Sequence, residues 1–197
     1  MANYTDLKND IVLWLADTDL VPYVPTFIRL CETKINREME TLVQETTVSA
    51  PVELGQTPEG TNYITLPCDF ERMVTITSPN TPEDTPLDYV SPDRMVNEDQ
   101  PYFYSIKGNY IMLPTGVEGV VMTYIAQFPE LTDAAPSNWL TSHAYDVLLY
   151  GSLSHAEGFL VNDARIAVWD AAFVTGMQTI NDEADRARTS GNTLRVI

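Results

Sequence analysis

Basic residues are scarce in this sequence of 197 residues, and their scarcity excludes several classes of protein. Lys and Arg number 11 against 28 Asp and Glu, which gives a net charge of -17. Because binding to nucleic acid or anionic lipid depends on a cationic surface, this balance argues against a protein whose main surface binds either. Apolar residues make up an ordinary 44%, so the chain is neither disordered nor fibrous.

Long apolar runs and cysteine motifs are also missing. The longest early apolar run, residues 11–16, is far shorter than the roughly 20 residues that cross a bilayer. Residues 1–6 lack the basic and apolar stretches of a secretory leader. Cys31 and Cys68 form no motif and are expected to stay reduced, as small apolar side chains. We therefore expect a protein of the cytoplasm that has no membrane contact and no disulfide.

Motifs for catalysis, metal binding and nucleotide binding are absent as well. There is no Gly-x-Ser-x-Gly elbow, no phosphate loop and no Gly-x-Gly-x-x-Gly sequence. His143 and His155 lack the close His/Cys spacing of a zinc site, so we interpret them as helix-face residues. The acids that could be nominated for glycoside hydrolysis are Glu38, Glu40, Asp69 and Glu71. With 28 acids such pairs arise by chance, and we predict no enzyme activity, no cofactor and no metal.

Apolar periodicity predicts two helices before residue 45. The first would begin with Thr5 as its cap, end near Asp17, and carry one apolar face made by Leu7, Ile11, Trp14 and Leu15. Pro25 suits the first position of the second helix. The apolar stripe of that helix consists of Phe27, Cys31, Ile35, Met39 and Leu42.

The charged residues of the second helix lie off its apolar stripe. They are Arg29, Glu32, Lys34, Arg37 and Glu40. This distribution predicts a long amphipathic helix with one buried side and one solvated side. Ion pairing between subunits is the alternative role for the charged side.

Between residues 45 and 128 the pattern changes to short strands separated by turns. Eleven of the 13 prolines lie between Pro51 and Pro136. The predicted strands are 46–54, 63–66, 73–77, 87–90, 102–107, 110–113 and 120–126. In the clearest hairpin, Gly108 and Asn109 could both supply positive φ angles to a two-residue turn. One helical turn is expected at 91–95, and the whole region reads as an antiparallel β domain.

Helical spacing returns after Pro136 and completes the predicted fold. Helices are expected over 145–160 and from Ile166 onward, with a break at 162–163. The stripe of the last helix is Ile166, Trp169, Phe173, Met177 and Ile180. The predicted class is α+β, in which N-terminal and C-terminal helical hairpins pack as a four-helix bundle around an inserted antiparallel β domain. The predicted domains are 1–44 and 137–188 for the bundle, 45–128 for the β domain and 189–197 for an extended C-terminal arm.

The last dozen residues carry a charge opposite to that of the chain. Residues 38–164 hold 19 acids and three bases, whereas the end of the chain has three bases with no acid among or after them. These bases are Arg186, Arg188 and Arg195, and the large apolar residues beside them are Leu194, Val196 and Ile197. Because this segment cannot pack on itself, we interpret it as a docking arm; a solvated terminus is the alternative.

Several short segments occur in an order that is informative as a set. They are 24–28, 32–38, 66–70, 86–92, 104–109, 129–140, 149–153, 163–165, 167–169, 186–188 and 190–191. The most telling is 129–140, which reads PELTDAAPSNWL. Together, and over nearly the whole chain, they resemble the head-to-tail adaptor, or connector, proteins of tailed bacteriophages, especially short-tailed ones.

The resemblance implies a structural role in the virion neck. It implies a ring of twelve copies that binds below the portal protein after DNA packaging, extends the DNA channel and presents a platform for the tail nozzle or tail-hub protein. Such a ring would be assembled in the host cytoplasm, and DNA would pass through it without specific binding. By the same resemblance, the portal-binding residues are Arg186, Arg188, Leu194, Arg195, Val196 and Ile197. The alternatives are a tail-side neck or tail-completion protein that does not bind the portal directly, and a carboxylate-dependent cell-wall hydrolase.

Overall fold

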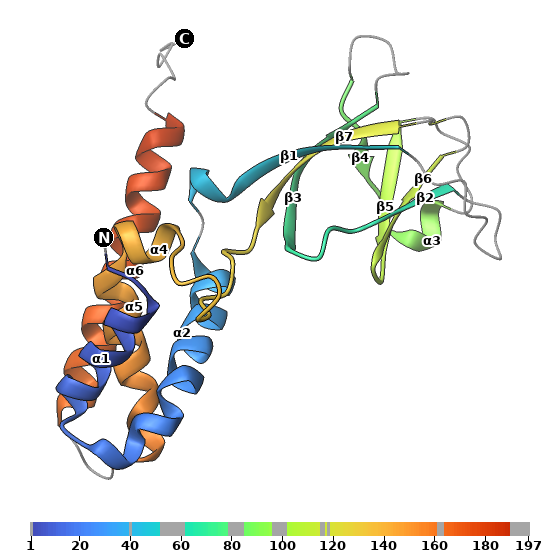
Figure 1. The fold of residues 1–197 in the computed structure, drawn as a ribbon. Helices are drawn as coiled ribbons and strands as arrows, with labels where there is room; N and C mark the ends of the chain where they lie inside the picture. The colour runs from blue at the N-terminus through green and yellow to red at the C-terminus, as the bar shows by residue number, and fades with distance from the viewer. Residues whose placement is uncertain are drawn as a thin grey trace, which may run out of the picture. The chain divides into compact units, whose positions relative to one another are not determined.

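The chain forms two units (Figure 1). The computed structural model describes residues 2–39, 41–51, 62–78, 85–95, 102–114, 117, 119–160 and 164–189. A helical unit comprises Met1–Leu42 and Phe128–Ile197, and a β unit comprises Val43–Gln127. Helices at both ends with strands between them confirm the predicted α+β class. Within the described ranges, none of the helices is both long and apolar enough to span a membrane.

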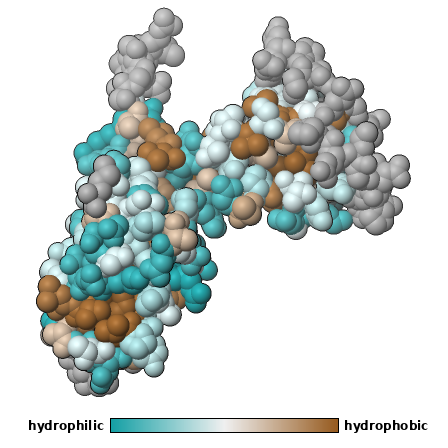
Figure 2. Space-filling view, viewed as in Figure 1, coloured by the Kyte–Doolittle hydropathy of each residue, from teal (hydrophilic) through white to brown (hydrophobic). Residues whose placement is uncertain are grey.

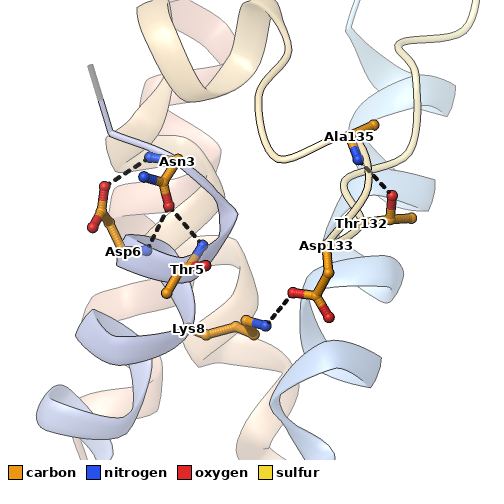
Figure 3. Close-up of polar contacts among 7 residues, drawn as sticks. All are labelled: Asn3, Thr5, Asp6, Lys8, Thr132, Asp133 and Ala135. Atoms are coloured by element: carbon orange, nitrogen blue, oxygen red, sulfur yellow. Dashed lines mark hydrogen bonds and ion pairs between the residues drawn. The ribbon is translucent and has the colours of Figure 1, made fainter.

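Helix α1 (Tyr4–Leu15) is capped by Asn3. The Asn3 side-chain oxygen accepts the backbone N–H groups of Thr5 and Asp6 at 2.8 and 3.0 Å, and the Asp6 carboxylate accepts the Asn3 N–H at 3.0 Å (Figure 3). The prediction that Thr5 caps this helix was wrong, because an Asn followed three residues later by an Asp forms a complete capping box. The helix ends at Ala16, whose φ of 55° is left-handed.

Helix α2 (Val24–Glu38) follows a 3-10 helix, η1 (Thr18–Tyr23). Most of its predicted stripe is confirmed, and the buried members are Phe27, Cys31, Ile35 and Met39. The inclusion of Leu42 was wrong. Because α2 ends at Glu38, Leu42 lies in a separate 3-10 turn, η2 (Leu42–Gln44), and is 40% exposed.

The C-terminal part of the helical unit consists of α4 (Trp139–His143), α5 (Tyr145–Ser154), the 3-10 turn η4 (His155–Gly158) and α6 (Arg165–Thr189). Along α6, Trp169, Phe173 and Met177 are buried, and Ile166 and Ile180 pack against the same core, which confirms its predicted stripe. The predicted break at 162–163 lies outside the described residues.

The helices α1, α2, α5 and α6 share one apolar core. Three of these helices approach closely at Gly151 of α5, which lies between Cys31 of α2 and Phe173 of α6. A Cβ atom at Gly151 would lie 2.6 Å from Cδ2 of Phe173 and closer still to the Cys31 sulfur. Glycine at this position therefore allows three helices to pack together, and burial raises the pKa of the Cys31 thiol to about 12.

Each of the seven predicted strands is present in the β unit. They are β1 (Glu45–Pro51), β2 (Asn62–Thr65), β3 (Phe70–Thr77), β4 (Asp88–Tyr89), β5 (Phe103–Lys107), β6 (Tyr110–Leu113) and β7 (Gly119–Ala126). They form two sheets, with strand orders β1-β7-β3 and β2-β6-β5-β4. The predicted helical turn is α3 (Pro92–Met95).

Two details of the β unit differ from prediction. Strand β4 pairs with β5 in parallel, with Asp88 opposite Phe103, so the domain is not wholly antiparallel. A parallel pair needs a crossover, and the chain between these strands, which contains α3, supplies it. In the β5–β6 turn Gly108 has a φ of 62°, whereas Asn109 does not have a positive φ. One positive φ at the first central position is the pattern of a type II′ turn.

Candidate functional site

Two of the four acids nominated for hydrolysis, Asp69 and Glu71, form structural hydrogen bonds. In the β unit, Asp69 accepts the Tyr124 hydroxyl at 3.0 Å, and Glu71 accepts the side-chain amide of Gln127 at 2.7 Å. These contacts bind the start of β3 to the end of β7. Glu38 lies at the end of α2, and Glu40 is outside the described residues. In the described part of the chain, His, Cys, Asp and Glu form no group of three or more that could hold a metal ion.

The two histidines lie in the helical unit, where His143 is exposed and His155 is half-buried. His143 on α4 stacks on Trp139, with ring centroids 5.0 Å apart, and its Nδ1 lies 3.2 Å from the Trp139 carbonyl oxygen. His155 begins η4, and burial, followed by the charge of Lys34, lowers the pKa of its imidazole. Local packing thus accounts for the His143 ring, whereas Nε2 of His155 is buried without a hydrogen bond to a described residue.

The connection from β7 to α4, residues 128–138, is fixed to helix α2. The Phe128 N–H donates to the side-chain oxygen of Asn36 at 2.8 Å. The Leu131 N–H donates to Oε1 of Glu32 at 3.0 Å. The side-chain amide of Asn138 donates to the Pro129 carbonyl at 2.8 Å and so closes the connection on itself. The segments 32–38 and 129–140, which carry much of the family resemblance, are thus in contact.

The same connection is fixed to helix α1 on its other side (Figure 3). The Tyr4 N–H donates to the Pro136 carbonyl at 2.7 Å, and the Lys8 ammonium lies 2.7 Å from a carboxylate oxygen of Asp133. A hydrogen bond of 3.0 Å from the Ala135 N–H to the Thr132 hydroxyl shapes the intervening turn. The chain that returns from the β unit is therefore held by two helices before it enters α4.

Glu32 is the residue of this connection that sequence reasoning misplaced. It was assigned to the solvated side of α2, but it is only 5% exposed. The spacing contained the signal, because Glu32 is four residues after Ile28 and three before Ile35, both buried. Its second carboxylate oxygen is buried without a hydrogen bond to any described residue. Burial is the main cause that raises the pKa of Glu32 to about 7; the nearby charge of Glu130 adds to it, and the Leu131 N–H opposes it.

The buried carboxyl predicts that the free energy of unfolding decreases as pH rises. The pKa of Glu32 is about 7 in the folded chain and 4.5 in an ordinary environment, so between these values the folded chain holds a proton that the unfolded chain has lost. Stability is therefore highest below pH 4.5 as far as this group is concerned, and up to ~3 kcal/mol is lost by pH 7 to 8. Glu32→Gln keeps an acceptor for the Leu131 N–H and is expected to remove this loss.

Urea unfolding at several pH values, followed by tryptophan fluorescence, measures this effect. All three tryptophans, Trp14, Trp139 and Trp169, lie in the helical unit, so the signal reports on that unit. The matched control is Glu130→Gln, which makes the same change of charge at an exposed neighbour and is expected to keep most of the slope. An equal slope in wild type and Glu32→Gln would show that Glu32 does not titrate in this range.

The end of α6 is where the structure places two of the six predicted portal-binding residues. Asn181 donates to the Glu38 carbonyl at 3.1 Å, and Ala184 is the last buried residue of the helix. The last turns of α6 extend beyond α5 (Figure 1). Arg186 is exposed there, and Arg188 lies 3.6 Å from the Asp185 carboxylate. The other four, Leu194, Arg195, Val196 and Ile197, lie outside the described residues.

Large apolar side chains are exposed on the helical unit. They are Leu13, Trp14, Val21, Tyr23, Leu30, Leu42, Phe159, Val168 and Val174. Trp14, predicted on the apolar face of the first helix, packs edge-on against Tyr150 but is 44% exposed, so its burial was predicted wrongly. Figure 2 shows apolar atoms gathered on the face of this unit in view. Large exposed apolar patches are typical of interaction surfaces.

Comparison with known families identifies the class of protein. The sequence profile of the SU10 adaptor protein family matches residues 2–196. Since the match covers nearly the whole chain, the protein belongs to the SU10 adaptor protein family, a family of phage head-to-tail adaptors. The predicted family resemblance is thereby confirmed. A search of curated proteins finds no match.

Proposed function

We propose that this protein forms a ring of twelve copies beneath the portal in the virion neck. The ring extends the DNA channel and presents the platform to which the tail nozzle or tail hub attaches. The observation that carries the proposal is the family match over residues 2–196. The role is structural, and it requires surfaces for the portal, the tail protein and neighbouring copies rather than a catalytic site.

The C-terminal segment is the proposed contact with the portal. Arg186 at the end of α6 is exposed and forms no ion pair with a described residue, so its charge is available to a partner. The residues that follow, Leu194 to Ile197, supply the apolar contacts. An arm of this kind loses its conformational freedom only on docking, which keeps each single contact weak. Repeated around a ring, weak contacts give a stable joint.

The acidic charge supports passage of DNA. Residues 38–164 have a net charge of -16, from 19 acids and three bases. A channel wall built from such a surface repels phosphates, and DNA slides past it because few Lys or Arg side chains are there to displace its counterions. We therefore propose that part of this region faces the channel, so that DNA passes without specific binding.

Native mass spectrometry of the full chain, alone and then with the portal protein encoded by the same phage genome, tests the proposal. Alone in low salt, the chain is expected to be a monomer of 22.1 kDa, because repulsion between copies carrying -17 is poorly screened there. With assembled portal, twelve copies per portal ring are expected. Rings formed spontaneously in dilute low-salt buffer would contradict the template-dependent assembly. Failure to bind assembled portal would favour a tail-side neck component instead.

A further inference from the structure

The outer face of α2 carries two arginines that form no ion pair with any residue that the structure describes. The exposed residues that recur at helical spacing along this face are Thr26, Arg29, Leu30, Thr33 and Arg37. Pro25 and Glu38 are also exposed on α2, and Thr26 and Arg29 line a pocket together with Glu130 and Asp133. Arg29 and Arg37 form no ion pair with a described residue, although the chain has 28 acids. Leu30 lies between them in sequence and is 46% exposed. Two unpaired guanidinium groups beside an exposed leucine are typical of an interface rather than of a merely solvated helix.

A groove of opposite charge lies between α5 and α6. It has a volume of about 620 Å³, and its lining includes Val147, Ala172 and Gly176. The two helices approach closely at its floor, since a Cβ atom on Gly176 would lie 2.7 Å from a methyl carbon of Val147. Asp146 and Glu183 also line the groove; both are exposed, and neither forms an ion pair with a described residue.

The outer face of α2 and the α5–α6 groove lie on different sides of the helical unit. Helix α2 lies along one side of α6, because Asn181 donates to the Glu38 carbonyl and the Lys34 ammonium lies 4.8 Å from the Phe173 ring centre. Glu183 is two residues beyond Asn181, so it points about 200° around α6, away from α2. One copy therefore cannot pair its own face with its own groove. Two complementary surfaces on different sides of a subunit give a head-to-tail contact, which can close into a ring.

We propose that the outer face of α2 docks into the α5–α6 groove of a second copy of this chain. Arg29 and Arg37 pair with Asp146 and Glu183, and Leu30 packs on the apolar floor. Arg29 and Arg37 are ~12 Å apart along α2, which fits within the ~18 Å over which the groove follows α6 from Ala171 to Glu183. The inference rests on the proposed ring and names the surfaces that join its copies.

Disulfide trapping tests this contact directly. The chain would carry Leu30→Cys on the face and Thr179→Cys in the groove, with the exposed Cys68 changed to Ala; Cys31 is buried, and its raised pKa keeps it unreactive. Mild oxidation is expected to give a ladder of multimers, because each copy is linked on two sides. Leu30→Cys alone and Thr179→Cys alone are the controls, and they are expected to stay monomeric.

The trapping is performed on portal-bound protein and on concentrated protein without portal. A ladder in either condition supports the contact, and its absence from both overturns it. Disulfide dimers from Leu30→Cys alone would also overturn it, since they would show the face packing on itself. If the chain does not bind portal at all, the proposed function fails, but the concentrated protein still decides whether the two surfaces meet. The two failures are thus distinguishable.

Charge reversal supplies the second measurement. Arg37→Glu and Glu183→Arg are each expected to lower the yield of the ladder at least about tenfold, and the double variant to restore it to within about threefold of the unreversed chain. The matched controls are Lys107→Glu in the β unit and Asp19→Arg on η1, which make the same changes of net charge outside both surfaces. An equal loss in these controls, or no recovery in the double variant, would contradict the assigned pairing.

Discussion

Gly151→Leu is expected to cause a large loss of stability of the helical unit. A Cβ atom added at this position would lie 2.6 Å from one carbon of the Phe173 ring and 2.7 Å from another, and it would overlap the Cys31 sulfur. Both neighbours are fully buried, so neither can turn into solvent. Overfilling a packed core usually costs about 1–3 kcal/mol, and with four added carbons on three converging helices we expect at least ~3 kcal/mol.

Alanine substitutions separate the effect of steric overlap on the free energy of unfolding from the effect of helix propensity. Alanine favours a helix over glycine by about 1 kcal/mol, so Gly151→Ala is expected to be destabilising only through its contacts, by ~1–2 kcal/mol net. The matched control is Gly176→Ala, also within a helix, whose Cβ meets one methyl carbon of Val147 closely and otherwise lies at ordinary distance. We expect that control to change the free energy of unfolding by less than ~1 kcal/mol.

Urea unfolding followed by tryptophan fluorescence provides the measurement, since all three tryptophans lie in the helical unit. The expected order of destabilisation is Gly151→Leu, then Gly151→Ala, then Gly176→Ala. Equal effects of the two alanine substitutions would show that the helices separate easily at Gly151. That result would contradict the close packing of α2, α5 and α6 described above.

Local patterns in the sequence account for most of the fold that could be predicted. The seven strands and the stripe of α6 follow from residue spacing within short windows, which is the scale at which strand and helix periodicities act. The errors occurred where the local structure is determined by side-chain capping or by where a helix ends, which short-range periodicity does not show. Leu42 fits the stripe of α2, but the helix ends before it, and Thr5 is a good cap that is displaced by the capping box of Asn3 and Asp6.

The connection at residues 128–138 shows why the rest could not be predicted locally. Glu32 and the Leu131 N–H are 99 residues apart, and no periodicity links a carboxylate on a helix with a backbone group in an irregular segment. A charged residue was therefore placed in solvent, although the buried carboxylate satisfies an N–H that would otherwise lack a partner. The order of the family segments indicated that 32–38 and 129–140 matter, but not that they touch.

The proposed binding end of the chain was predictable for a different reason. Its signal is compositional, because three bases without an acid follow a strongly acidic region, and that contrast needs no contact to be seen. The surfaces that join neighbouring copies have no such signal. Arg29 and Glu183 became informative only when the structure showed each of them exposed and without an ion pair among the described residues.

Deleting residues 189–197 is expected to abolish portal binding while leaving the helical unit folded. The last buried residue described in α6 is Ala184, so the deletion removes no described core contact, and the free energy of unfolding is expected to change by less than ~0.5 kcal/mol. Portal binding is expected to respond differently, because in the proposed ring the arm would act once in every copy. Losing one weak contact per copy removes the gain from multivalency, and we expect at least a ~100-fold loss of apparent affinity for the portal.

Two substituted chains separate the contributions within the arm. The first variant replaces the three apolar residues by Ser: Leu194, Val196 and Ile197. It lacks the proposed apolar contacts and is expected to bind the portal more weakly at every salt concentration. The second variant replaces the three bases by Ala: Arg186, Arg188 and Arg195. Its loss of portal binding is expected to be greatest at low salt, since screening already reduces charge pairing at high salt. Surface-immobilised portal and a salt series measure both effects. Undiminished binding by the deleted chain would place the portal contact elsewhere and make the exposed apolar surface of the helical unit the next candidate.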